Sequence, residues 1–282
     1  MSDLIKNIDS LNSKLKNELI MSLTELENLI DSTTGGYLGD IPDYIVEKLP
    51  SDKTQEDFFH MFDSVVEYAK KNKFDLAKET INNFFDGKIV FDIERKYFLG
   101  RYIKFGIILS NNICDEKLFV KIFKDNYEEL HFLFYQSGPY VEPAVALFVN
   151  SHVDNFDCFA RFYFANATKL YMVSEYVKMV YDYSNDLTFK KYQRGVIRKL
   201  STMPDYDEIS EYITEGFEHI TKIRENHYKM LQNMAKGKFA FLDITKENFL
   251  ICEDKTGQKH SKMIDYGQIF LINNDKNQSF NG

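Results

Sequence analysis

Apolar residues recur at three- and four-residue steps along the first thirty positions, with polar residues between them. The apolar positions are Leu4, Ile8, Leu11, Leu15, Leu19, Leu23, Leu26 and Ile30. This spacing predicts a long amphipathic helix that ends before Gly35-Gly36. Two interpretations stay open for it: a helix packed on its own domain, or a secretion or partner-binding helix. The stripe is too short for a sustained coiled coil.

Two or three further helices are predicted between residues 43 and 90. After Asp86-Gly87 the spacing of the apolar residues changes. Short apolar and β-branched runs then predict strands. The predicted strands cover residues 88–91, 102–109, 118–123, 170–177, 249–251 and 262–264. Helical spacing is found from about 126 and again over 205–235. The order of these elements predicts an α+β fold, with a helical region over 1–90 and a separate domain over 92–282.

Composition excludes several classes of function. The formal charge of −8 argues against a general nucleic-acid binder. The three cysteines form no CxxC pair, and the six histidines show no HExxH motif, so a zinc site is not predicted. No run of 18 apolar residues indicates a membrane span, and the first residues lack the pattern of a Sec signal peptide.

The residues with the clearest chemistry lie near the C-terminus. Asp243 and Asn248 are five apart on a loop that leads into a strand, and Asp265 follows where the next strand ends. Phosphoryl transfer from ATP needs one carboxylate to take the proton of the attacking hydroxyl. It also needs oxygen ligands for Mg²⁺. The alternative is a pair of capped turns in a β-hairpin.

These residues and their spacing resemble the protein-kinase catalytic loop D-x-x-x-x-N followed by D-[FY]-G. The resemblance makes Asp243 the catalytic base and makes Asn248 and Asp265 the metal ligands. Upstream, residues 169–177 resemble the fifth strand and hinge of a kinase. That match puts Ser174 at the gatekeeper position and turns the backbone of residues 175–177 toward the adenine, so Glu175 and Val177 are predicted to bind nucleotide.

The same resemblance extends to the phosphate-binding residues. Lys121 matches the lysine that contacts the ATP phosphates, and its partner on the next helix would be Glu128 or Glu129, with Glu128 preferred. Gly100 and Gly106 stand where the family has three glycines, at a different separation. The His-Arg that precedes the catalytic aspartate in kinases is replaced by Phe241-Leu242, so no receptor for an activation-segment phosphate is expected.

The chain resembles most closely the NleH/OspG family of type III secreted bacterial effector kinases, chiefly over residues 237–248 and 128–138. This resemblance implies a bilobal protein-kinase-like fold with an abbreviated C-lobe, using ATP and Mg²⁺. It also implies secretion into a host cell cytoplasm, a host protein substrate phosphorylated on Ser or Thr, and contact with ubiquitin or a ubiquitin-charged conjugating enzyme. Without secretion, a cytoplasmic protein is expected.

Two alternative interpretations assign the chain to other functional classes. A pseudokinase that acts as a binding module would account for the segment with Gly100 and Gly106, which has two glycines where kinases have three. A helical interaction protein with chance motif matches would contain no strands over 92–177.

Overall fold

The computed structural model describes most of the first two thirds of the chain and several short segments after it. The described residues are 3–17, 23–33, 35–96, 103–125, 138–152, 159–178, 239–241, 249–253, 256–257, 259–266 and 269–271. The chain forms two compact units. The first unit consists of residues 1–152 and 161–176, and the second consists of residues 153–160 and 177–282.

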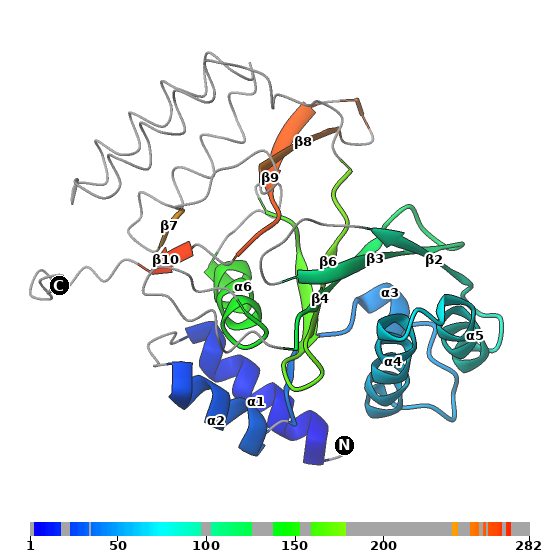
Figure 1. Cartoon of the computed structure of the whole chain (residues 1–282), viewed down its shortest axis with the longest axis horizontal. Helices are drawn as coiled ribbons and strands as arrows, with labels where there is room; N and C mark the ends of the chain where they lie inside the picture. The colour runs from blue at the N-terminus through cyan, green and yellow to red at the C-terminus, as the bar shows by residue number, and fades with distance from the viewer. Residues whose placement is uncertain are drawn as a thin grey trace, which may run out of the picture. The chain divides into compact units, whose positions relative to one another are not determined.

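A six-stranded antiparallel sheet is the centre of the first unit (Figure 1). Its strands lie in the order β1-β5-β6-β4-β3-β2. Their bounds are β1 Tyr37–Gly39, β2 Phe91–Lys96, β3 Ile103–Asn111, β4 Leu118–Phe123, β5 Phe162–Asn166 and β6 Tyr171–Glu175. The α+β class predicted from the sequence is therefore confirmed.

The helices of the first unit begin before the sheet and continue within it. They are α1 Asp3–Asn17, α2 Leu23–Thr33, α3 Asp43–Val46, α4 Gln55–Lys70, α5 Phe74–Phe85 and α6 Val141–His152. The prediction of two or three helices between 43 and 90 is confirmed by α3, α4 and α5. The single long helix predicted over the first thirty residues is wrong, because α1 and α2 are separate helices that contact one another. Among the described residues, no helix is long and apolar enough to cross a membrane.

One face of the sheet packs against α4 and α5 through aromatic side chains. Phe58, Phe62 and Phe85 are fully buried there and contact one another and the strands. Phe164 on β5 packs edge-on against Phe62, with ring centroids 5.0 Å apart. Because these rings join α4 and α5 to β2–β6 in one hydrophobic cluster, the helices before residue 90 share a core with the strands after it.

An asparagine side chain binds the backbone of each edge strand. Asn12 of α1 donates to the Gly39 carbonyl at 3.0 Å and accepts from the Gly39 N–H at 2.8 Å. Asn82 of α5 does the same at Phe91, at 3.0 and 2.7 Å. The carboxamide supplies the donor and acceptor that a further strand would otherwise supply. Each edge of the sheet is thereby fastened to a helix.

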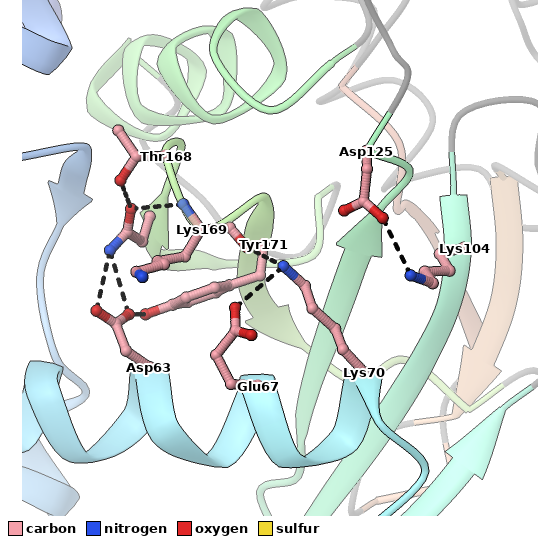
Figure 2. A network of polar contacts seen from close by, with 9 residues as sticks. Asp63, Glu67, Lys70, Lys104, Asp125, Thr168, Lys169 and Tyr171 are labelled. Carbon is pink, nitrogen blue, oxygen red and sulfur yellow. Dashed lines mark hydrogen bonds and ion pairs between the residues drawn. The ribbon is translucent and has the colours of Figure 1, made fainter.

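A buried polar cluster fastens α4 to the turn between β5 and β6 (Figure 2). Asp63 accepts hydrogen bonds from the hydroxyls of Tyr37 and Tyr171 and from the Asn166 amide, the last two at 2.8 and 3.1 Å. Desolvation raises the pKa of Asp63, and the three hydrogen bonds offset part of that rise. Two turns further along α4, Lys70 donates to the Lys169 carbonyl at 2.7 Å.

The second unit is described in short pieces. Its strands are β7 Phe239–Phe241, β8 Phe249–Glu253, β9 Lys259–Met263 and β10 Ile269–Leu271. β8 pairs with β9 as an antiparallel hairpin, and β7 pairs with β10. A small cluster contains Ala160, Val177, Leu250, Cys252 and Ile264. The strands predicted over 249–251 and 262–264 correspond to this hairpin.

Replacing Asp63 by Ala is expected to lower the free energy of unfolding by about 2–3 kcal/mol, because three donors lose their acceptor in a largely buried site. Urea unfolding followed by circular dichroism measures this loss, with Ser64→Ala, an exposed neighbour on α4, as the control.

The raised pKa of Asp63 also predicts how this loss depends on pH, because the folded state favours the protonated carboxyl. The wild type's advantage over the variant is therefore largest below about pH 4 and shrinks as pH rises. A loss no larger than that of Ser64→Ala would contradict this role.

Candidate active site

Lys121 lies in the middle of the sheet but points away from the aromatic cluster. Its neighbours Val120 and Ile122 on β4 belong to that cluster, and side chains alternate along a strand. The Lys121 side chain therefore projects from the opposite face. It is only 8% exposed, and its ammonium forms an ion pair with the carboxylate of Glu142, which is 2% exposed.

Glu142 lies in the first turn of α6. Its backbone N–H donates to the Gly138 carbonyl at 3.1 Å. Pro143, the next residue, is compatible with the first turn because the N–H it lacks would have no partner there. The carboxylate also gains from the positive end of the helix dipole. Removing two charges from water is costly unless they pair closely, so α6 must be held in a fixed place relative to β4.

Gly106 lies directly beside Lys121 in the sheet. The register of β3 and β4 pairs Gly106 with Lys121, and Met172 of β6 flanks Lys121 on its other side. A glycine leaves the sheet face next to the ammonium without a side chain from β3. The sequence-predicted nucleotide residues Lys121 and Gly106 are thus brought together, whereas Gly100 lies outside the described residues.

The predicted hinge residues follow β6. Ser174 is buried, and the Glu175 N–H donates to the Arg161 carbonyl at 2.7 Å. The Tyr176 N–H donates to the Lys117 carbonyl at 2.9 Å. The chain passes from the first unit to the second between Tyr176 and Val177. The stretch chosen from sequence as a hinge is therefore the point where one compact unit ends.

Asp265 follows β9 in the second unit and is half-buried. The next residue, Tyr266, is fully buried; its hydroxyl donates to the Ala160 carbonyl and its ring stacks on Phe159 at 6.0 Å. The Ala160 N–H in turn donates to the Met263 carbonyl at 2.8 Å. These contacts hold the backbone on both sides of Asp265.

Besides Gly100, three predicted site residues lie outside the described residues: Asp243, Asn248 and Glu128. Their positions stay predictions. Within the described ranges, no three His, Cys, Asp or Glu side chains gather as a metal site would require.

The partner that the structure gives to Lys121 is Glu142, which sequence reasoning missed. The sequence-based prediction was Glu128 or Glu129, because these acids lie in a stretch of helical spacing soon after the strand. A usable signal was present: Gly138-Pro139 precedes a continuous apolar run that contains one acid at its start. Such a run predicts a buried helix whose lone carboxylate requires a partner.

Comparisons with known proteins give one weak likeness. No family model matches the chain, and no curated protein does. Among solved structures, it is similar to the choline kinase LicA from Streptococcus pneumoniae at 14% identity and a TM-score of 0.34. The match covers 71% of this chain and 70% of that one.

Replacing Lys121 by Met is expected to cost about 3–5 kcal/mol of stability, because it leaves the Glu142 carboxylate buried without its cation. The double variant Lys121→Met/Glu142→Leu should recover most of that loss, since both charges are gone. Urea unfolding of the single and double variants measures the difference.

The control is Lys104→Met. Lys104 forms a solvent-exposed ion pair with Asp125 at 3.2 Å, drawn in Figure 2, and its loss should cost less than about 1 kcal/mol. Equal destabilisation in the single and double variants would show that the two charges do not stabilise each other.

Proposed function

We propose that this chain is an ATP-dependent phosphotransferase of the protein-kinase type. The observation that carries the proposal is the buried ion pair between Lys121 and Glu142. Counting the described elements from β2, the lysine lies on the third strand and the glutamate on the next described helix, before two further strands. Protein kinases use a lysine on the third strand paired with a glutamate on the next helix to hold the ATP phosphates.

In this proposal, Lys121, Glu142, Gly106 and the segment after β6 bind the nucleotide. The Lys121 ammonium, oriented by Glu142, provides the positive charge for the α- and β-phosphates. Gly106 leaves room beside it. The backbone around Glu175 and Val177 binds the adenine, which suits a segment that starts where β6 ends.

The second unit would supply the groups that act on the transferred phosphate. Asp243 accepts the proton of the acceptor hydroxyl, and Asn248 and Asp265 provide amide and carboxylate oxygens for the metal. Mg²⁺, when bound, neutralises charge on the phosphates. The half-buried carboxylate of Asp265, held by its neighbour Tyr266, has the ligand chemistry that Mg²⁺ prefers.

The acceptor in this proposal is a Ser or Thr hydroxyl of a host protein, and the chain is a bacterial effector. The support is the resemblance over residues 128–138 and 237–248. These segments lie outside the described residues except for β7 and Gly138.

A pseudokinase that serves as a binding module is the second candidate. Its support is the sequence around Gly100 and Gly106, which has two glycines where kinases have three. The helical interaction protein has less support, because β2 to β6 form a sheet in the region where it would have no strands.

Incubation of the purified chain with γ-labelled ATP, Mg²⁺ and a generic Ser/Thr acceptor tests the proposal. We expect transfer by the wild type and a loss of about 10²–10⁴-fold in rate for Asp243→Ala. Lys104→Met, on a neighbouring strand, should retain the wild-type rate. Mg²⁺-dependent ATP binding without any transfer would favour the pseudokinase. No binding at all would overturn the proposal.

The same assay tests regulation. Since Leu242 replaces the arginine that reads an activation-segment phosphate, phosphatase-treated enzyme should keep its rate, as should Ser279→Ala. Adding ubiquitin or a ubiquitin-charged conjugating enzyme should raise that rate by stabilising the active conformation. A rate that falls to background after phosphatase treatment would contradict this expectation.

A further inference from the structure

Helix α6 is buried on all sides over its central residues, 144–147. Four consecutive residues, Ala144 to Leu147, are each less than 5% exposed. Because successive residues of an α-helix point about 100° apart, these four cover every side of the axis. A helix that is apolar all round needs neighbours on more than one side. The sheet, through β5 and β1, supplies one of them.

Helix α1 supplies another. Among the described elements it contacts α6 more extensively than it contacts β1, α2 or α4, and the two helices lie side by side in Figure 1. Leu11 and Leu15 of α1 are buried. Near the ends of both helices, the Ser151 hydroxyl lies 3.1 Å from the Lys16 carbonyl of α1 and 2.7 Å from the Phe148 carbonyl of its own helix, so its one proton is shared between these two acceptors.

Asn12 fixes α1 to the sheet. Its side chain is 2% exposed and makes the two hydrogen bonds to Gly39 described above. Gly39 has φ of +82°, and a Cβ there would lie 2.1 Å from the Tyr163 carbonyl oxygen, so only glycine fits this position. The ion pair between Lys16 and Asp40, at 3.2 Å, lies one turn away.

We infer that Asn12 is a positioning residue for the nucleotide site. It holds α1 on the sheet edge, α1 holds α6, and α6 places Glu142 on Lys121. The first ninety residues then belong to the phosphate-binding machinery rather than to a separate appendage. The effect of Asn12 on nucleotide binding rests on the proposed function. Its support of α6 through α1 does not.

The experiment compares Asn12→Ala with Asn82→Ala. The two variants lose the same pair of side-chain-to-backbone hydrogen bonds, at opposite edges of one sheet. Both should lower the melting temperature by similar amounts. Only Asn12→Ala should speed hydrogen exchange of the α6 amides, by on the order of tenfold, because only it loosens the support of α6.

Nucleotide affinity is the second readout. ATP with Mg²⁺ should bind Asn12→Ala about five- to tenfold more weakly than wild type, and Asn82→Ala as wild type does. Ser151→Ala, a mild change at the surface between α1 and α6, should shift both readouts in the same direction by less.

Equal effects of Asn12→Ala and Asn82→Ala on α6 exchange and on affinity would overturn the inference. So would α6 exchange that stays at the wild-type rate in Asn12→Ala. If the wild type binds no nucleotide, the proposed function fails and the link to nucleotide fails with it. Faster α6 exchange confined to Asn12→Ala and Ser151→Ala would still be evidence that Asn12 supports α6 through α1.

Discussion

The ion pair between Lys121 and Glu142 is the constraint on which the rest of the first unit depends. Both groups are nearly excluded from water, and a charge in that setting is tolerated only when its partner is held in place. The partner is on a different element, so α6 has to stay fixed against β4. A well-packed apolar pair at these positions would serve stability equally well. In the proposed function, the two charges serve to bind the ATP phosphates.

The packing on both faces of the sheet holds β4 and α6 in place. The aromatic cluster of α4 and α5 fills one face of the sheet, and the Asp63 hydrogen bonds tie α4 to the β5–β6 turn. The other face carries Lys121, with α6 against it. Asn12 and Asn82 complete the two sheet edges with the same chemistry. The edge at β1 differs because its asparagine comes from the helix that also supports α6.

The elements predicted best from the sequence are those with a clean local pattern. Residues 118–123 form β4 as predicted, and the predicted strands at 102–109 and 170–177 differ from β3 and β6 by a few residues at their ends. β1 was missed because three residues after two glycines carry no periodicity. β5 was missed although Phe162-Tyr-Phe164 is a short apolar run of the kind that predicted the other strands; all five residues of β5 are buried, as in a strand covered on both faces.

At the candidate site, too, only the residues with a local sequence pattern were predicted. Lys121 could be selected from its strand, but its partner is set by the position of α6, which depends on contacts with α1 and the sheet that no local pattern encodes. Glu142 is 21 residues from Lys121, and the sequence alone offered nearer acids. The predicted base and metal ligands at 243, 248 and 265 come from motif spacing, and of these only Asp265 lies in the described residues.

Calorimetric titration of ATP with Mg²⁺ into two proteins tests the central claim most directly: the wild type, and the charge-free double variant Lys121→Met/Glu142→Leu. The double variant should remain folded, so any loss of binding reports on the two charges rather than on the fold. The account predicts that the wild type binds and that the folded double variant does not. Equal affinity in both proteins would contradict it, because the ion pair would then have no part in holding nucleotide.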